Sequence, residues 1–554
     1  MIHKDLLNAA LGNEDADTVF FNAKVFSPYT CRWKKTSFAV KNGIVLGEGN
    51  YTGKCETDLE GSKVLPGLSD AHVHIESSLL TPREYGRLVL KKGTTTVFAD
   101  PHEIANVAGV KGIKYMISES RNTPLDIFHT APSCVPATNL DMGGASVTSS
   151  DLLTFSESEN IAGLGEMMNY PGVLSGDDEV YKKLRIFDVV DGHCPLLSGK
   201  ELNAYIMQGI SSDHECTSAK EAGEKLEKGM YIMLREGSTE KNLKDLVSVV
   251  TPYNVSKCMF ATDDRHADTL IRDGHIDDCI RKAISCGLKP ELAYRMATLS
   301  PAERFGLTDR GALSPGRIAD FCIIDDSDEF SVLETYKSGR QVKDTGYKEP
   351  ETIDYKFKVP ENIPLDIPQK TMAKAHIAGI IKGQILTENI LKEIKPDEIP
   401  DFRNDILKCV VCDRYRGIKS GLGLVHGFKM KKGAIASSVS HDSHNIISVG
   451  AFDEDILASV NLLKKSGGGM SVYVDEKGFI LPLECGGIMS YKSYDEVNED
   501  ITKLKEILKS TGCIKNPFMY LSFLSLTVIP EIRITERGVF DVSGFRDIPL
   551  FQAE

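Results

Sequence analysis

The sequence lacks any apolar run of the roughly 18 residues that a transmembrane helix requires. Its first twenty residues contain Glu14, Asp15 and Asp17, and they include no apolar core of the kind found in a secretory signal peptide. Both patterns argue against a membrane protein and a secreted protein. We therefore expect a cytoplasmic protein with no membrane as partner.

Positive charge is also in short supply. The chain has 65 Lys and Arg residues against 79 Asp and Glu residues, which gives a formal net charge of −14. A chain this acidic is repelled by nucleic acid and by anionic lipid surfaces. We therefore expect no nucleic acid among its partners.

Cysteine and phosphate-binding motifs are incomplete. The 13 cysteines follow no regular spacing, and the one CxxC motif, Cys409 to Cys412, has no second pair that would complete a zinc site. This usage is typical of a reducing compartment with mostly buried thiols. Gly467 to Gly469 is not followed by the Lys-Ser or Lys-Thr of a phosphate-binding loop, so we interpret it as a turn.

The residues that are present suit a large folded protein. Apolar residues make up 41% of the sequence and charged residues 26%, which is too balanced for disorder. At roughly 150 residues per domain, 554 residues allow three or four domains, or one large barrel with appendages.

The N-terminal region predicts a small β-domain. Short β-like runs alternate with turns over the first 65 residues, and Asn42-Gly43 predicts a hairpin turn because both residues tolerate positive φ. A further β-like run, Phe321 to Asp325, lies far along the chain. We expect one β-domain assembled from residues 1–65 plus 305–355.

The intervening residues, 66–304, predict a (β/α)₈ barrel. Apolar runs recur along this part of the chain, and each is followed by a loop and a helix-like stretch. The eight runs span residues 64–75, 94–99, 125–131, 161–167, 187–190, 209–212, 230–234 and 257–261. Because eight strands that alternate with helices close into a barrel, the count of eight supports this architecture.

The C-terminal third predicts a separate domain. Residues 355–369 hold several prolines and are interpreted as a linker. Residues 370–554 mix strand-like and helical stretches and are numerous enough for a core of their own. The expected fold class is α/β, with an additional C-terminal α+β domain.

Candidate metal ligands follow five of the eight runs. His72 and His74 end the first run, and their i, i+2 spacing on a strand turns both imidazoles toward the barrel axis. The other ligands end the fourth, fifth, sixth and eighth runs: Glu166, His193, His214 and Asp263. Barrels build their active sites at the C-terminal ends of their strands, which is where these residues lie. A purely structural role for these residues would leave several buried charged side chains unpaired. The sequence therefore predicts a metal site.

The segment Pro66 to His74, Pro-Gly-Leu-Ser-Asp-Ala-His-Val-His, resembles the signature of the amidohydrolase superfamily. That resemblance implies a metal centre in a barrel beside a split β-sandwich. Glu166 stands where other members have a carboxylated lysine. Together with the segments that contain His102-Glu103 and Ser440-His441-Asp-Ser-His444-Asn, the chain resembles the adenine deaminase family within that superfamily.

The resemblance implies a reaction and roles for these residues. His72, His74 and Asp263 would hold one divalent metal ion, Glu166 would bridge to a second, and His193 and His214 would complete it. Mn²⁺ or Fe²⁺ is expected, with Zn²⁺ as an alternative. The substrate would be adenine, hydrolysed to hypoxanthine and ammonia, with Asp263 carrying the proton from water to the leaving amine.

Other residues have roles that the sequence leaves open. Glu103 is a candidate acid for a ring nitrogen, and His102, Arg235 and Glu236 are candidates for contact with the substrate. A structural role is the alternative for each of them. His441 and His444 are three residues apart, a spacing that on a helix would place them on one face. A third metal site is one interpretation of this pair, and a rim-lining or structural role is the commoner alternative.

Three competing functions remain. A related metal-dependent hydrolase could act on a cyclic amide or an N-acetyl group, although Glu166 and the extra C-terminal domain argue against it. A non-catalytic scaffold predicts missing ligands, whereas all six are present. An iron-loaded centre could also decompose peroxide as a side reaction. We expect a homo-oligomer, most simply a dimer, because enzymes of this size usually assemble with closed symmetry.

Overall fold

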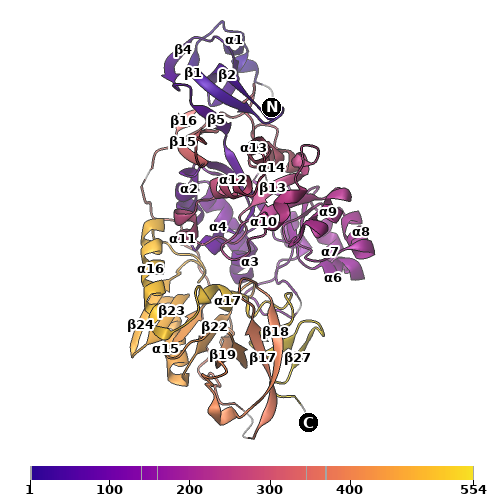
Figure 1. The fold of residues 1–554 in the computed structure, drawn as a ribbon, viewed down its shortest axis with the longest axis vertical. Coiled ribbons are helices and arrows are strands. Elements are labelled where there is room, and N and C mark those ends of the chain that lie inside the picture. The colour runs from indigo at the N-terminus through magenta and orange to yellow at the C-terminus, as the bar shows by residue number, and fades with distance from the viewer. Residues whose placement is uncertain (1–2, 139, 159, 345, 368–370, 553–554) are drawn as a thin grey trace.

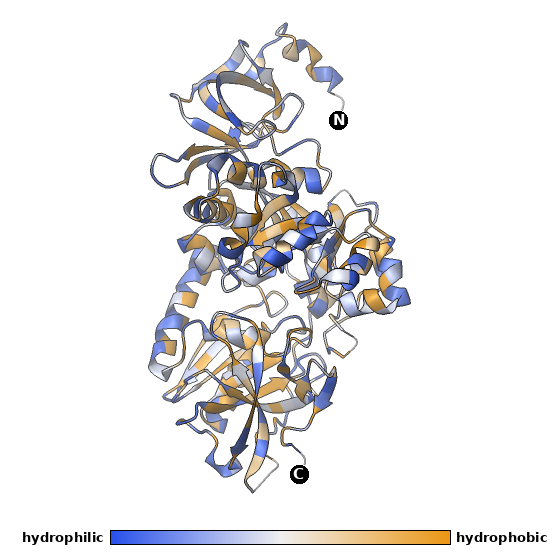
Figure 2. Ribbon diagram, turned by 45° about the vertical axis from the view of Figure 1, so that its right-hand side comes forward, coloured by the Kyte–Doolittle hydropathy of each residue, from blue (hydrophilic) through white to orange (hydrophobic). Residues whose placement is uncertain are grey.

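The computed structural model describes residues 3–138, 140–158, 160–344, 346–367 and 371–552. Figure 1 shows three parts along the longest axis: N-terminal strands at one end, a helix-rich middle, and a C-terminal part at the other end. The hydropathy colouring of Figure 2 shows apolar strands inside the middle part and helices of mixed character around them. None of the helices in the described ranges is both long and apolar enough to cross a membrane.

The N-terminal part is one sheet built from two separated segments. Antiparallel pairing of Phe321 with Pro66 and of Ile323 with Val64 joins the late strand to the first segment. Asn42 and Gly43 both have positive φ at the predicted hairpin turn. A short helical start, η1 (Lys4–Leu6) and α1 (Leu7–Ala10), precedes the sheet. Its strands are β1 (Ala16–Ser27), β2 (Arg32–Lys41), β3 (Ile44–Glu48), β4 (Gly53–Asp58), β5 (Lys63–Pro66), β14 (Phe321–Asp325), β15 (Ser331–Lys337) and β16 (Arg340–Gln341).

The two faces of β1 pack into different cores, because neighbouring residues of a strand point to opposite sides. Phe20 belongs to an aromatic cluster with Phe38 and Phe321, whereas Val19 packs with Leu6 and Leu46. The edge strands β4 and β16 are largely exposed.

In the middle part, six of the eight predicted β-like runs coincide with a strand, whereas the runs at 187–190 and 209–212 overlap β10 and β11 only at their last residue. The first five strands pair in parallel in chain order, and so do the last three. The strands are β6 (Leu68–Val73), β7 (Thr94–Ala99), β8 (Asp126–Ala131), β9 (Ile161–Met167), β10 (Val190–Gly192), β11 (Ser212–Asp213), β12 (Tyr231–Arg235) and β13 (Cys258–Ala261).

Hydrogen bonds join the five-stranded sheet to the three-stranded sheet at both of its edges. The Asp263 amide donates to the His72 carbonyl at 3.0 Å, beside a parallel bridge between Val73 and Asp263. On the other side, the Ser211 amide donates to the Val190 carbonyl at 3.2 Å. Parallel strands need crossover connections, which helices supply here. These are η2 (Ile75–Ser78), α2 (Pro82–Leu90), α3 (His102–Ala108), α4 (Val110–Ser120), α5 (Ser149–Leu153), α6 (Tyr170–Ser175), α7 (Asp178–Leu184), α8 (Gly199–Met207), α9 (Ala219–Glu227), α10 (Leu243–Leu246), η3 (Val247–Val249), η4 (Val255–Lys257), α11 (Ala267–Arg272), α12 (Ile276–Ser285), α13 (Pro290–Met296) and α14 (Leu299–Arg304).

A buried lysine fastens the ends of two short strands. The Lys225 ammonium on α9 donates to Asp213 Oδ2 at 2.9 Å, to Glu221 Oε1 at 2.7 Å and to the Cys194 carbonyl at 2.8 Å. The side chains of Lys225 and Asp213 are fully buried. Asp213 and Cys194 directly adjoin His214 and His193, so this ion pair sets the positions of both imidazoles.

We expect Lys225→Met to lower the free energy of unfolding by about 3–5 kcal/mol, because Asp213 would keep a buried charge without its cation. Lys228→Met is the matched control. Its partner Glu224 is solvent-accessible, so its expected cost is below about 1 kcal/mol. Thermal and urea unfolding of the two variants would check the difference. Equal midpoints for both variants would show that the buried pair contributes no more than the surface pair.

The C-terminal part contains an eight-stranded sheet and a smaller three-stranded sheet. The strands of the large sheet are β17 (Ala373–Ile380), β18 (Thr387–Ile394), β19 (Ile406–Cys412), β20 (Ser420–His426), β21 (Ala434–Ser437), β22 (Ile446–Gly450), β23 (Gly469–Val474) and β24 (Lys477–Pro482). The small sheet contains β25 (Ile532–Thr535), β26 (Gly538–Asp541) and β27 (Arg546–Ile548). The helices are η5 (Pro396–Glu398), α15 (Asp453–Ser466), α16 (Tyr494–Thr511) and α17 (Pro517–Phe523).

The two faces of the large sheet have different partners. On β19, Val410 and Cys412 pack with Ile456 of α15, whereas Cys409 and Val411 belong to the largest core of the molecule. That core also contains Ile104 of α3, so the C-terminal part shares its packing with the middle part. Cys409 and Cys412 are buried free thiols on opposite faces of one strand, so the two side chains cannot chelate the same ion. This arrangement agrees with a packing role.

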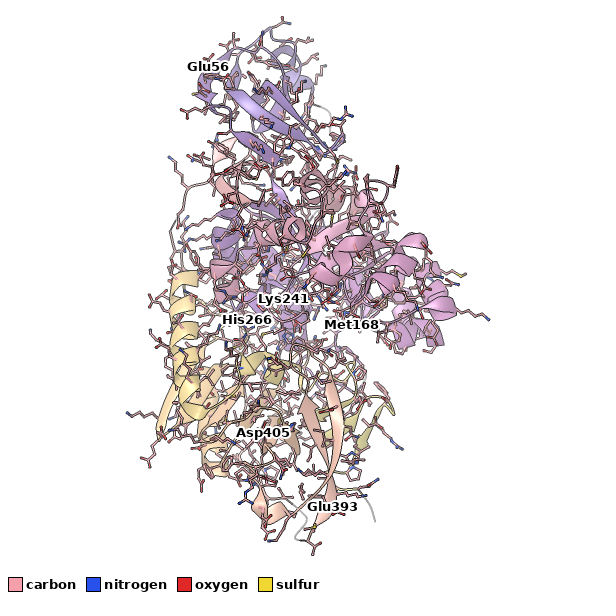
Figure 3. The ribbon with its side chains drawn as sticks, viewed as in Figure 1. Glu56, Met168, Lys241, His266, Glu393 and Asp405 are labelled. Carbon is pink, nitrogen blue, oxygen red and sulfur yellow. The ribbon has the colours of Figure 1, made fainter. Side chains whose placement is uncertain are left out.

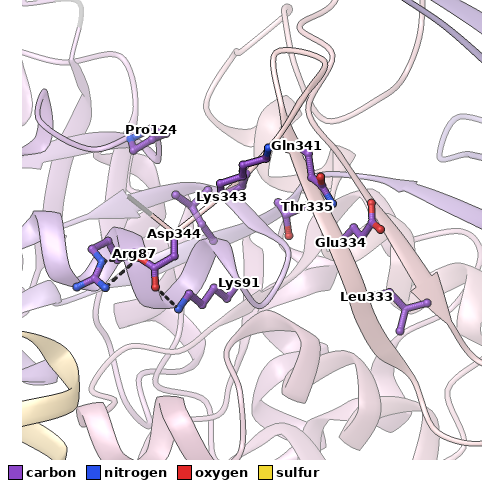
Figure 4. A pocket seen from close by; sticks show the side chains of 11 residues that line it. Arg87, Lys91, Pro124, Leu333, Glu334, Thr335, Gln341, Lys343 and Asp344 are labelled. Carbon is purple, nitrogen blue, oxygen red and sulfur yellow. Dashed lines mark hydrogen bonds and ion pairs between the residues drawn. The ribbon is translucent and has the colours of Figure 1, made fainter. Parts of the chain in front are cut away.

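The connection between β16 and β17 has no helix or strand among its described residues. Its start is fastened to α2 by Asp344, which accepts hydrogen bonds from Arg87 at 2.9 Å and from Lys91 at 2.6 Å in a surface pocket (Figure 4). This pocket is remote from the predicted metal ligands. Gly467 caps the end of α15 with positive φ, in agreement with the predicted turn.

Candidate metal centre and active site

The predicted ligands converge where the middle part meets the C-terminal part. Met168, Lys241 and His266 mark this junction in Figure 3. A cavity with about 410 Å³ of empty space, partly open to solvent, lies here. Five of the six predicted ligands line it: His74, Glu166, His193, His214 and Asp263. His72 lies directly behind them, with its Nε2 3.1 Å from that of His74.

His72, His74 and Asp263 form one group of donors. His74 Nε2 lies 3.1 Å from Asp263 Oδ1 and 3.2 Å from Glu166 Oε1, and His72 Nε2 lies 3.6 Å and 3.7 Å from the same oxygens. The side chains of both histidines and of Asp263 are 5% exposed or less. They come from the ends of β6 and β13, which the pairing of these edges brings together.

Glu166 faces a second group with its other oxygen. Glu166 Oε2 lies 2.6 Å from His193 Nδ1 and 3.3 Å from His214 Nε2. The carboxylate thus directs Oε1 toward one pair of imidazoles and Oε2 toward another. Sets of three side chains from both groups have donor atoms close enough to hold a metal ion.

Asp100, which follows β7, fixes two of these ligands. Its carbonyl accepts a hydrogen bond from His74 Nδ1 at 2.9 Å, which leaves Nε2 of His74 free to coordinate. Its Oδ2 accepts from the Glu166 amide at 3.0 Å. A Cβ on Gly165 would lie 2.2 Å from this oxygen, so the residue before Glu166 has to be glycine.

The charges around the centre keep its carboxylates ionised. Burial opposes ionisation of Glu166, but His214 and His193 hold the pKa of its carboxyl well below the usual range. Burial likewise opposes ionisation of Asp263, whereas His72, His74 and Arg235 hold its pKa well below the usual range. Both side chains are therefore available as anionic ligands.

Arg235 lines the cavity, but other side chains already bind its guanidinium. It donates to Asp263 Oδ2 at 2.7 Å and to Glu215 Oε2 at 2.9 Å. These bonds favour a role for Arg235 in orienting Asp263. Glu236, the other candidate for contact with the substrate, is not among the residues that line the cavity, and its carboxylate accepts from Lys282 at 2.8 Å.

Glu103 lines the cavity, but both of its oxygens are taken. His441 Nδ1 and His444 Nε2 each contact one oxygen. Burial opposes its ionisation, whereas His441, His444 and His102 hold its pKa well below the usual range. An acid that must donate a proton needs the opposite shift, so the structure argues against Glu103 as the general acid.

His441 and His444 lie in a turn rather than on a helix, so they share no helix face. What brings them together is their common partner, Glu103. His102, a candidate for contact with the substrate, lines the cavity. Its Nδ1 lies 3.6 Å from Glu166 Oε1, and its Nε2 lies 3.6 Å from Glu103 Oε1.

Several cavity residues were not anticipated from the sequence. Glu215 and Glu240 join the acidic side, and burial raises the pKa of Glu240 to about 7. The opposite wall comes from the C-terminal part: Ile385, His441, Asp442, Phe523, Leu526 and Ile529. Glu215 directly follows a predicted ligand, which is a usable signal, whereas the apolar wall residues carry none.

Comparison with known proteins also divides the chain into the two parts that line the cavity. The model of the amidohydrolase family matches residues 63–342, and that of the adenine deaminase C-terminal domain matches residues 384–546. An adenine deaminase of Methanoculleus marisnigri is 57% identical over 517 residues, which cover 93% of this chain and 99% of that protein. The chain belongs to the adenine deaminase family.

Other members of the adenine deaminase family match along nearly the whole chain. The adenine deaminase of Methanoregula boonei is 51% identical over 557 residues, and adenine deaminase 2 of Carboxydothermus hydrogenoformans is 44% identical over 568 residues. In both comparisons 99% of each chain is covered. All six candidate ligands lie in the stretch matched by the amidohydrolase model, and the apolar wall lies in the stretch matched by the C-terminal model.

Proposed function

We propose that the chain hydrolyses adenine to hypoxanthine and ammonia at a binuclear divalent metal centre. The observation that supports this most directly is the split geometry of Glu166, with one oxygen toward His74 and the other toward His193 and His214. A carboxylate placed in this way can give one oxygen to each of two cations. The names of the most similar relatives point to adenine as the substrate.

The residues present fit such a centre. Nε2 of His72 and Nε2 of His74 face each other at 3.1 Å, and carboxylate oxygens approach the same point from two sides. Imidazole combined with carboxylate suits Mn²⁺ or Fe²⁺ and also accepts Zn²⁺. Divalent cations held here would act as Lewis acids and lower the pKa of a water ligand from about 15.7 to about 7.

The chain's own residues would then orient the substrate and move the proton. Asp263 directs Oδ1 to the ligand group, while Arg235 holds Oδ2 at 2.7 Å. In our proposal Asp263 takes the proton of the attacking water and returns it to the amine, which leaves poorly unless it is protonated. Arg235 would hold the carboxylate in the orientation that this transfer needs.

We also propose that the five-stranded and three-stranded parallel sheets are two arcs of one (β/α)₈ barrel, formed by residues 66–304. The hydrogen bonds from Asp263 to His72 and from Ser211 to Val190 support closure on both sides. Residues 1–65 plus 305–355 would form the split β-sandwich, and residues 370–554 the C-terminal α+β domain. The strand β14, which pairs with β5, supports the composite assignment.

For assembly and compartment we propose a cytoplasmic homodimer. All 13 cysteines are free thiols, which suits a reducing compartment. A closed dimer is the commonest assembly of soluble enzymes. Sedimentation velocity would test the dimer directly.

The function is tested by ammonia release from adenine after purification with iron, manganese or zinc and with the metal counted per chain. We expect turnover that depends on bound metal and stops when a chelator removes it. Hydantoins and N-acetyl sugars serve as the comparison panel. Preference for either class over adenine would contradict the proposed substrate, and full activity of metal-free protein would contradict the proposed centre.

A further inference from the structure

Asp442 presents a carboxylate oxygen that no described residue binds. The residue is 5% exposed and lines the cavity, and its buried Oδ2 has no hydrogen-bond partner among the residues that the structure describes. An unpartnered buried acceptor is costly and is normally satisfied by a donor. Because this oxygen belongs to a residue of the cavity wall, a bound ligand is the natural source of that donor.

Asp442 is held in place from the barrel side. Its neighbour His441 contacts Glu103 through Nδ1, and His444 contacts the other oxygen of the same carboxylate. Asp442 Oδ1 lies 3.9 Å from His102 Nε2. These contacts fix the turn that carries Asp442, while Oδ2 stays unpaired.

The position of Asp442 relative to the metal centre suits a two-ring base. The His102 imidazole stands between them, with Nδ1 3.6 Å from Glu166 Oε1 and Nε2 3.9 Å from Asp442 Oδ1. Asp442 and the ligand groups line one cavity, so in the proposed pose a purine with its amino-bearing carbon at the centre extends its imidazole ring toward Asp442.

The remaining wall is apolar and would cover the faces of a flat base. Phe523, Leu526 and Ile529 line the cavity, and the Phe523 ring stacks on His441 with centroids 4.6 Å apart. Cavities of this kind, apolar with a few placed polar groups, fix a ligand's orientation through those groups.

We propose that Asp442 is a specificity-determining residue that accepts a hydrogen bond from the ring N–H of the substrate, and so selects free adenine over purines substituted on that nitrogen, such as nucleosides. The inference rests on the proposed deamination of adenine. Adenine carries one ring N–H, on its imidazole ring, in addition to the amino group that is replaced. A substituted ring nitrogen offers Asp442 no donor and leaves the buried carboxylate unpaired.

The test compares kcat/KM for adenine and for 9-methyladenine in the wild-type chain, Asp442→Ala and Asp442→Asn. Burial raises the pKa of the Asp442 carboxyl to about 7, so the kinetics are measured at a pH well above that value, where the carboxylate is ionised. A hydrogen bond to a charged group then predicts that Asp442→Ala loses roughly tenfold to a hundredfold in kcat/KM for adenine. The loss should fall mainly on KM, while the value for 9-methyladenine changes less than about threefold, since no bond is lost there. Asp442→Asn, which keeps the volume and one neutral acceptor, should lie in between. Where turnover of 9-methyladenine is too slow to measure, its inhibition constant against adenine gives the same comparison.

Unchanged kcat/KM for adenine in Asp442→Ala, or an equal loss for both bases, would overturn the role of Asp442. Asp475→Asn, at an exposed aspartate between β23 and β24, controls for the loss of one carboxylate from this part of the chain. Metal content and thermal midpoints establish that each variant is folded and loaded. Wild-type protein with no activity on adenine would overturn the proposed function itself. Wild-type activity on adenine, together with variants that keep the preference for adenine over 9-methyladenine, would overturn only the role of Asp442.

Discussion

Replacing Glu166 with alanine is expected to reduce the metal content from a pair of cations to at most one, and to lower kcat/KM for adenine by roughly a thousandfold. The two oxygens of Glu166 face different groups of imidazoles, one at 3.2 Å from His74 Nε2 and the other at 2.6 Å from His193 Nδ1. A Lewis acid is worth several kcal/mol in the transition state, and about 1.36 kcal/mol corresponds to tenfold in rate. Metal analysis and steady-state kinetics on the same preparation would measure both effects.

Glu227→Ala is the control, because this glutamate at the end of α9 is exposed and is not among the residues that line the cavity. It should retain the metal and the activity of the wild-type chain. Two cations still bound per chain in Glu166→Ala would contradict the bridging position. Full activity with a single cation would show that the second cation is dispensable.

Local sequence patterns predicted most of the strands and the convergence of the candidate ligands. Six of the eight β-like runs coincide with a strand, whereas those at 187–190 and 209–212 overlap one only at their last residue. His72 and His74 face the centre together, since alternate residues of a strand share a face. The same rule explains why Arg235 points inward while the next residue, Glu236, binds Lys282 outside the cavity.

Long-range contacts could not be predicted in this way. Glu103 and His441 are 338 positions apart, and no local pattern indicates that their side chains meet. Without that contact, the spacing of His441 and His444 did not reveal why the two residues are there, whereas in the structure a carboxylate from the barrel side contacts both imidazoles. The sequence also could not indicate that Phe523, Leu526 and Ile529 line the cavity. Apolar residues in a helix and in the segment after it usually belong to the hydrophobic core.

The C-terminal part therefore contributes more than its sequence indicated. It has apolar clusters of its own, as expected, and in addition Val411 of β19 shares one continuous core with Ile104 of the middle part. The wall of the cavity depends on that packing. In our proposal, the surface of the C-terminal part that recognises the substrate is therefore also the surface that packs against the middle part.

The second large effect is expected at Asp263. Asp263→Asn keeps the size of the side chain and one oxygen for the ligand group, but an amide cannot take a proton from water at neutral pH. General acid–base catalysis contributes roughly 10²- to 10⁴-fold, so kcat should fall by that amount while KM for adenine changes little. Asp273→Asn, whose carboxylate pairs with Arg272 near the surface, should leave both constants unchanged.

Metal analysis decides how the Asp263→Asn result is read. Asp263 Oδ1 is 3.1 Å from His74 Nε2, so the residue has a ligand role as well as the proposed proton-transfer role. A loss of kcat in protein that retains its metal supports proton transfer by Asp263, whereas a loss that only follows the loss of metal reduces its role to that of a ligand. Near-normal kcat in metal-loaded Asp263→Asn would contradict proton transfer through this carboxylate. The orientation imposed by Arg235 would then serve coordination alone, because the guanidinium holds the oxygen that faces away from the imidazoles.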